Sequence, residues 1–243
     1  MTKKINNKLT KLIKYYNLIN YNLIYDNQSI NRYKKNASNI SGNKAELLKS
    51  LEVSIKNIKN CELKNNATDI VFGDGHPDSQ IMIIGEGPGS EEDKEGLPFL
   101  GRAGQLLDKM LNAINLGRNN IYITNVVNFK PPENRAPTEK EIERYLPYLK
   151  KHIEIINPKI LILLGSTALN ALIDNKKTIS EARGKWVFKK IGKCETFVIV
   201  SFHPAFLMRQ PNQKKYAWID LKMVRKKILE LKIKIESCTT KKY

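Results

Sequence analysis

The sequence predicts an α/β fold with a central, mostly parallel four-stranded sheet that helices cover on both faces. Four short apolar runs are typical of buried strands, and segments with helical signals lie between them. This alternation favours parallel strands joined by helices. Polar or glycine-containing turns directly follow the runs, at the strand ends where open α/β folds bind their ligands.

The four predicted strands are, in chain order, Ile81–Ile84, Ile121–Val127, Ile160–Leu164 and Phe197–Ser201. The helix predicted over Thr138–Ile156 opens with Thr-Glu-Lys-Glu, a capping-box pattern. The helix predicted over Ala103–Leu116 precedes Gly117, and glycine commonly follows a helix end. The other predicted helices are Ile5–Tyr25, Lys44–Ile58, Ser166–Ile173 and Lys214–Ile235.

The net charge of +18 is concentrated at the two ends of the chain. Residues 1–60 carry 12 Lys and Arg against 3 Asp and Glu, and residues 222–243 carry 8 against 2. Such segments suit a polyanionic partner, because Lys and Arg displace counterions from phosphate, although a compositional bias toward Lys, Asn and Ile would give the same charge. We therefore predict a basic, Asn/Lys-rich helical extension over residues 1–60, an α/β domain over 61–228 and a basic tail over 229–243.

Two broad classes of protein are disfavoured. No apolar run is long enough to span a membrane, and the polar first residues lack the apolar core of a secretory signal, so a cytoplasmic protein is expected. The three cysteines, Cys61, Cys194 and Cys238, form no CxxC pair. This argues against a disulfide framework and against a self-contained zinc site.

The glycine-rich turn Gly85–Gly89 is the first candidate ligand loop. It lacks the Lys and Ser/Thr of a P-loop, and Ser90 occupies the last glycine position of a GxGxxG pattern, so a nucleotide cofactor is disfavoured. Its glycines allow backbone to approach a ligand closely, and Glu86 supplies a carboxylate. The acidic run Glu91–Asp93 either orients water and supports positive charge, or stabilises a helix N-terminus.

Three further side chains suit the recognition and removal of a planar base. Phe99, in a loop bounded by glycines, either stacks on a base or fills the core. Asn125, at the end of a predicted strand, carries a carboxamide that matches the hydrogen-bonding edge of uracil, and a turn role is the alternative. His203 either caps a turn or donates a hydrogen bond to a base oxygen that becomes negative as the base leaves.

Two segments are expected to contact DNA. A proline-rich loop carries Lys130 and Arg135, which are predicted to bind phosphates. Leu207, Met208 and Arg209 combine apolar side chains with a cation. This composition suits a wedge that enters a duplex and fills the gap left by an extruded nucleotide.

Taken together, these segments resemble the family 4 (type-4) uracil-DNA glycosylases over residues 61 to about 228. The resemblance is specific because several motifs occur in the same order. They are Gly85–Gly89, Glu91–Asp93, Gly96–Gly104, Tyr122–Asn125, Pro131–Pro137, Arg183–Trp186 and His203–Arg209.

The resemblance implies a three-layer α/β/α sandwich and hydrolysis of the N-glycosidic bond of deoxyuridine in DNA by base flipping, a step of base-excision repair. It implies an intercalating role for Leu207 to Arg209 and a loop-supporting role for Asn134. Gly87 stands where other branches of the superfamily carry a water-activating acid, so the general base is left open. The implied catalytic residues are Glu86, Glu92, Asn125 and His203, and the implied uracil pocket contains Gly87, Phe99, Asn125 and His203.

The sequence departs from this family at its iron–sulfur cluster. Family members hold a [4Fe-4S] cluster with four cysteines, and such a cluster needs its full thiolate set. Here Cys61 matches one ligand, whereas Lys64, Phe129 and Tyr145 stand at the other ligand positions. We therefore expect no cluster and no other cofactor, with packing of Phe129 and Tyr145 in place of the metal.

Two other functions are kept open. One is a non-catalytic DNA-binding relative that associates with a polymerase or repair complex through residues 1–60. The other is a nucleotide-binding enzyme that acts on small molecules, which predicts tight binding of ATP or NAD. The expected partner is uracil-containing DNA, bound by a monomer, and the N-terminal extension is a candidate contact for a repair or replication partner.

Overall fold

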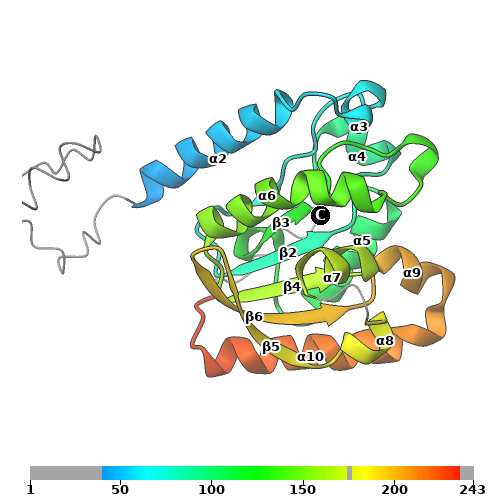
Figure 1. Cartoon of the computed structure of the whole chain (residues 1–243). Coiled ribbons are helices and arrows are strands. Elements are labelled where there is room, and N and C mark those ends of the chain that lie inside the picture. The colour runs from blue at the N-terminus through cyan, green and yellow to red at the C-terminus, as the bar shows by residue number, and fades with distance from the viewer. Residues whose placement is uncertain (1–39, 174–176, 236–243) are drawn as a thin grey trace, which may run out of the picture. The chain divides into compact units, whose positions relative to one another are not determined.

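A six-stranded sheet forms the centre of the structure, with the strand order β1-β3-β2-β4-β6-β5 (Figure 1). The computed structural model describes residues 40–173 and 177–235. The four inner strands run parallel to one another and correspond to the four predicted strands. They are β2 (Ile81–Gly85), β3 (Tyr122–Asn125), β4 (Ile160–Leu164) and β6 (Cys194–Ser201).

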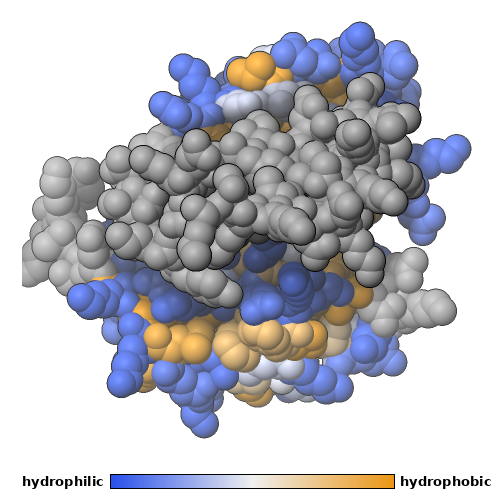
Figure 2. Space-filling model, turned by 60° about the vertical axis from the view of Figure 1, so that its left-hand side comes forward, coloured by the Kyte–Doolittle hydropathy of each residue, from blue (hydrophilic) through white to orange (hydrophobic). Residues whose placement is uncertain are grey.

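The prediction of a four-stranded sheet was wrong, because the sheet has two additional antiparallel strands, one at each edge. β1 (Asp74–Gly75) is too short to produce a sequence pattern, and it pairs with β3. β5 (Trp186–Ile191) pairs with β6 and leaves Phe188 60% exposed beside Lys189 and Lys190. Charges on such an edge oppose pairing with another sheet. Figure 2 shows hydrophobic surface atoms bordered by hydrophilic ones.

Helices cover both faces of the sheet, which confirms the predicted three-layer α/β/α fold. Met82 and Ile84 of β2 belong to one apolar core, and Ile81 and Ile83 belong to the other, because alternate side chains of a strand point to opposite faces. In Figure 1 the sheet lies between α6 and α10. The first core is completed by α2 (Ile40–Lys56), α6 (Glu139–Ile156) and α7 (Ser166–Leu172), and the second by α5 (Arg102–Asn112) and α10 (Lys214–Glu230).

The connections between these elements contain short helical turns, and several of them follow the carboxyl ends of the parallel strands. Within the described residues, no helix has the length and apolar character needed to cross a membrane. The short elements are α3 (Glu62–Asn66), α4 (Ser90–Glu95), η1 (Arg118–Asn120), η2 (Pro132–Asn134), α8 (Ile179–Ala182), α9 (Pro204–Arg209) and η3 (Pro211–Gln213).

The folded unit is longer than the predicted domain of residues 61–228. It begins at Ile40, because Leu51 and Ile55 of α2 are buried in the same core as α6. At the other end, Ile233 is 9% exposed and packs in the second core, so the first part of the predicted tail also belongs to the fold. The helix predicted over Ile5–Tyr25 lies outside the described residues.

Two predicted helix ends test the local signals. At the start of α6, Thr138 Oγ1 accepts from the Glu141 amide and Glu141 Oε2 accepts from the Thr138 amide, which confirms the capping box. The predicted end of α5 at Leu116 was wrong, because the helix stops at Asn112 and Asn115 adopts a left-handed conformation with φ 62°. The chain turns there and buries Leu116 in the core.

A buried imidazole links the first core to the sheet. His152 of α6 is 2% exposed, its Nε2 lies 3.0 Å from the Tyr122 hydroxyl, and its ring stacks on Phe72 with 4.5 Å between centroids. Burial lowers the pKa of His152 to about 3. The imidazole is therefore neutral in the folded protein at neutral and mildly acidic pH.

We predict that His152 makes the fold sensitive to acid. Below pH ~6.5 the unfolded chain protonates this imidazole and the folded chain does not, so the free energy of unfolding falls by up to ~1.4 kcal/mol per pH unit as the pH drops toward the folded pKa. Thermal denaturation of the wild type and of His152→Gln between pH 7 and pH 5 measures this term. The variant should lose less stability on acidification, and equal losses would contradict the assignment.

Candidate active site

One cavity of about 180 Å³ lies where the parallel strands end and gathers the side chains predicted to bind a base. Glu86 follows β2, Asn125 ends β3, and His203 follows β6. The carboxyl ends of parallel strands meet at one edge of the sheet, which explains why residues distant in sequence converge there. The other predicted site residues that line the cavity are Gly87, Glu92, Phe99, Asn134 and Arg135.

The missing side chain of Gly85 makes this convergence possible. Gly85 pairs with Asn125 in the register of β2 and β3. A Cβ at Gly85 would lie 2.5 Å from both Asn125 Oδ1 and Phe99 Cζ, closer than nonbonded atoms tolerate. Glycine at this position therefore allows the carboxamide and the ring to sit against the end of β2.

Phe99 forms one wall of the cavity from a constrained backbone. Its φ of 56° is left-handed, a conformation that costs a non-glycine residue on the order of 1–3 kcal/mol. A Cβ at Gly104 would overlap the Phe99 carbonyl, so glycine is needed there as well. The Phe99 ring is 5% exposed, and its centroid lies 5.6 Å from that of His203 with an interplanar angle of 31°.

The structure defines the hydrogen-bonding state of His203. Its Nδ1 accepts from the Ala205 amide at 3.2 Å, at the N-terminus of α9. A neutral imidazole with Nδ1 as acceptor carries its proton on Nε2. Burial, with a further contribution from the charge of Arg209, lowers the pKa of His203 to about 4, while Glu92 acts in the opposite direction. His203 is therefore a neutral hydrogen-bond donor near pH 7.

The two carboxylates of the cavity have different surroundings. Glu86 Oε2 accepts a hydrogen bond from the Thr167 hydroxyl, which leaves Oε1 for a ligand or water. Glu92 accepts from the amides of Gly89, Leu100 and Gly101 at 2.9–3.1 Å. These bonds tie the Gly85–Gly89 turn to the loop of Phe99. Glu92 thus holds together two walls of the cavity.

Thr167 and Gly85 are site residues that sequence reasoning missed. Thr167 lies in the first turn of α7, directly after the strand-to-helix turn at Gly165, and is 7% exposed. The sequence does contain a signal for this role. A hydroxyl residue follows one strand end, and the carboxylate of Glu86 follows another. Gly85 was treated only as part of a glycine-rich turn.

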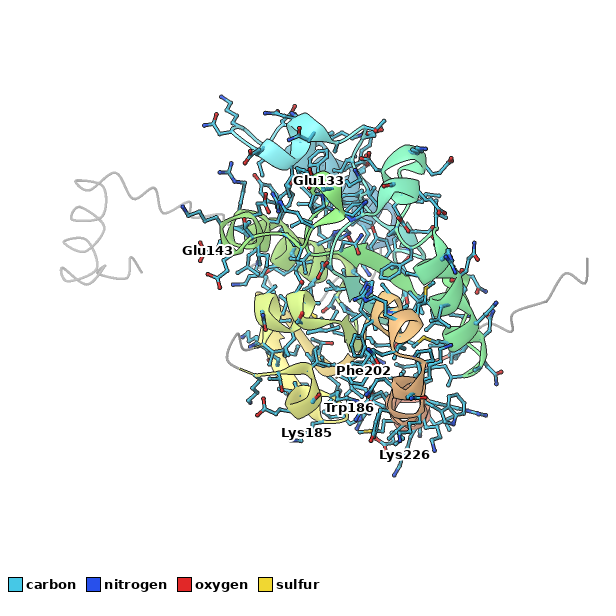
Figure 3. The ribbon with its side chains drawn as sticks, turned by 90° about the vertical axis from the view of Figure 1, so that its right-hand side faces the viewer. Glu133, Glu143, Lys185, Trp186, Phe202 and Lys226 are labelled. Atoms are coloured by element: carbon cyan, nitrogen blue, oxygen red, sulfur yellow. The ribbon has the colours of Figure 1, made fainter. Side chains whose placement is uncertain are left out.

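The residues predicted to contact DNA divide into three groups. Lys130 and Met208 are partly exposed and Arg209 is exposed, whereas Leu207 is 1% exposed and packs with Phe202 and Ala217. The predicted wedge role of Leu207 is therefore corrected, since burial in α9 removes its side chain from the surface. Figure 3 views this side, with Glu133 of the proline-rich loop above Phe202.

The proline-rich loop is more constrained than the sequence predicts. Arg135, predicted to bind phosphate, forms two hydrogen bonds with the Glu141 carboxylate at 2.7 and 2.8 Å. Asn134 adopts φ 54°, and its Oδ1 accepts from the Ser90 hydroxyl at 3.2 Å. Asn134 thus joins the loop to α4 beside the cavity. Next to it lies a second cavity of about 500 Å³, which shares Glu86, Asn134 and His203 and includes Arg209.

The residues at the four cluster positions do not fit a [4Fe-4S] cluster. Cys61 Sγ lies 3.1 Å from the Tyr145 hydroxyl, Tyr145 and Phe129 are buried in the first core, and Lys64 is exposed. One thiol, one phenol, one phenyl ring and one ammonium lack the four thiolates that such a cluster needs. Among the described residues, no group of three or more His, Cys, Asp or Glu side chains is placed to hold a metal ion.

Comparison with known proteins places this geometry in context. Residues 72–222 match the family model of the uracil-DNA glycosylase superfamily. The chain is 42% identical over 170 residues to a type-4 uracil-DNA glycosylase of Thermotoga maritima, covering 70% of this chain and 87% of that protein. A type-4 uracil-DNA glycosylase of Sulfurisphaera tokodaii is 39% identical over 183 residues, which cover 73% of this chain and 83% of that protein.

We predict that NMR titration of the imidazoles finds His203 neutral and protonated on Nε2 down to about pH 4. Replacement Arg209→Gln should raise the pKa of His203, because the arginine charge disfavours the imidazolium. His152→Gln identifies the signals of the other buried imidazole. A His203 signal that titrates near pH 6.5 in the wild type would contradict the assignment.

Proposed function

The chain belongs to the type-4 uracil-DNA glycosylases of the uracil-DNA glycosylase superfamily, and from this premise we propose that it hydrolyses the N-glycosidic bond of deoxyuridine in DNA. Uracil leaves and an abasic site remains, as in base-excision repair. The observation that carries the proposal is the single cavity that joins Glu86, Phe99, Asn125 and His203. These groups suit an everted pyrimidine, and an enzyme that acts on a base must take it out of the stack.

Recognition of uracil is assigned to Phe99 and Asn125. The Phe99 ring offers a flat surface on which the base stacks, a contact worth ~1–3 kcal/mol. Asn125 supplies one acceptor and two donors for the O4 and N3–H edge. Gly87 lines the same cavity and lets backbone approach the base. Because Gly85 has no side chain, Asn125 and Phe99 can both lie against the end of β2. The face and the edge of one base can therefore be contacted at the same position.

Catalysis is assigned first to His203. When the bond between the sugar and uracil N1 breaks, both electrons leave with the base and negative charge develops on its O2. A neutral imidazole that donates a hydrogen bond from Nε2 to this oxygen stabilises the negative charge. Preorganised donors of this kind commonly account for ~10²–10³ of the rate.

The sugar left by this step carries positive charge, and Glu86 is assigned to support it. Thr167 holds one oxygen of the Glu86 carboxylate. We assign the other oxygen to orienting the water that adds to the sugar carbon, and the proton that this water loses passes to solvent or to the released uracil anion. Glu92, whose carboxylate binds three backbone amides, contributes chiefly by keeping the cavity walls together.

DNA binding is assigned to the surface around the cavity. Arg209 of α9 and Asn134 of the proline-rich loop both line the second cavity. Met208 precedes Arg209 in α9, and Lys130 belongs to the same loop as Asn134. The second cavity shares lining residues with the first, and we assign it to the strand beside the flipped nucleotide. Arg135 supports the loop through Glu141, and any phosphate contact it makes competes with that pair.

The basic segments outside the catalytic fold are assigned to electrostatic attraction and to partners. Before the folded unit begins at Ile40, residues 1–39 carry 8 Lys and Arg against one acidic residue. Such a charge favours duplex DNA in a salt-dependent manner. A monomer with a repair or replication partner at this extension is the assembly that we propose.

We predict that the wild type releases uracil from a uracil-containing oligonucleotide, so that alkali cleaves the strand at that position. His203→Ala and Asn125→Ala should each lower the saturating single-turnover rate by about 10²–10³, because each removes a group aimed at the base. Duplex affinity, measured with a uracil-free oligonucleotide, should remain within a few-fold of the wild type. Equal loss of rate and affinity would show that these side chains are structural, and absence of cleavage by folded wild type would refute the function.

We further propose that this member of the family folds without the [4Fe-4S] cluster. The support is the Cys61–Tyr145 contact, which places a phenol where a cluster would need a thiolate. Burial of Phe129 and Tyr145 fills the same region with apolar atoms.

We predict that protein purified without air and supplied with iron and sulfide holds no stoichiometric iron and shows no visible cluster absorption. The matched variant Lys64→Cys/Phe129→Cys/Tyr145→Cys, which restores the thiolate set, should bind iron under the same conditions. Tyr145→Phe should lower the free energy of unfolding by ~1 kcal/mol, because Cys61 loses its partner. A wild type that binds a full cluster would refute this proposal.

A further inference from the structure

Arg118 makes a set of contacts that join the Phe99 loop to the start of β3. It lies in η1, two elements away in sequence from Phe99, and its side chain is 26% exposed. Its Nη1 donates to the Pro98 carbonyl at 3.1 Å, and its Nη2 donates to the Phe99 carbonyl. One guanidinium therefore holds two consecutive carbonyls of this loop.

Two carboxylates fix the orientation of this guanidinium. Arg118 Nη1 lies 2.7 Å from Asp74 Oδ2, and its Nε lies 3.0 Å from Asp108 Oδ1. Asp74 belongs to the edge strand β1 and Asp108 to α5. Because the guanidinium has five N–H donors in a rigid plane, it can satisfy both carboxylates and both carbonyls at once. Lysine, a point charge with three donors, cannot reproduce this planar arrangement.

The Phe99 backbone needs such support. Its left-handed φ of 56° is unfavourable for a phenylalanine. Its carbonyl accepts from Arg118 and fills the space that a side chain at Gly104 would occupy. Arg118 does not line the cavity, so any effect it has on a bound base passes through Phe99. The carbonyl of Phe99 and its ring belong to one residue, and fixing the first restricts the second.

We propose that Arg118 is a positioning residue that holds the Phe99 ring against the uracil. This inference rests on the proposed function, in which Phe99 stacks on the base. The guanidinium selects the left-handed backbone of Phe99 before DNA binds, so the stacking surface is already in place when the nucleotide enters. The charge of Arg118 is paired with the carboxylates of Asp74 and Asp108.

The test compares Arg118→Lys with the wild type in two measurements. The saturating single-turnover rate of uracil release should fall about tenfold, because base–aromatic stacking is weakened, while affinity for a uracil-free duplex stays within about twofold. Amide hydrogen exchange over residues 96–101 should become faster. In the Phe99→Leu background the same substitution should cause no further loss of rate, since the residue it acts through is gone.

A matched control is Arg144→Lys. Arg144 also donates to two consecutive carbonyls, those of Lys59 and Asn60, but it lies away from the cavity. This variant should leave both the excision rate and the exchange of residues 96–101 unchanged. Unchanged exchange in Arg118→Lys, or full additivity with Phe99→Leu, would overturn the inference. If the folded wild type releases no uracil, the proposed function fails, and the exchange measurement still decides whether Arg118 holds the loop.

Discussion

The site depends on the close contact between the backbone at the end of β2 and the side chains of Asn125 and Phe99. Gly85 and Asn125 are direct partners in the parallel register, so any side chain at Gly85 would occupy the space of the carboxamide and of the Phe99 ring. Parallel strands bring their carboxyl ends to one edge, and a glycine there converts a packed sheet edge into a hollow. The pocket therefore depends on the lack of a Cβ atom at position 85.

Around this hollow, the polar residues divide into those that face a ligand and those that hold the loops. His203, Asn125 and Glu86 present side-chain atoms to the cavity, whereas the Glu92 carboxylate binds backbone amides of two loops. The loops carry left-handed residues and would not keep their shape unaided. Hydrogen bonds from charged groups supply that rigidity, and they do so at positions where a ligand needs fixed geometry.

The region of the family's metal cluster shows a different way to join segments of the chain. A cluster would join three segments through four thiolates, whereas here a buried contact between Cys61 and Tyr145 and the packing of Phe129 occupy the core. The loss of three thiolates could be read from the sequence, because ligand chemistry depends on residue type alone. The Cys61–Tyr145 contact could not, since it joins residues 84 positions apart.

The sequence by itself determined the four parallel strands, the capped start of α6 and the set of side chains that line the first cavity, because apolar periodicity, cap chemistry and motif composition are local. It did not determine the edge strands, the end of α5, the burial of Leu207 or the partners of Arg135. Tertiary structure decided these, since they depend on what other segments lie alongside. Thr167 belongs to the site because β2 pairs with β4, which places the first turn of α7 beside Glu86.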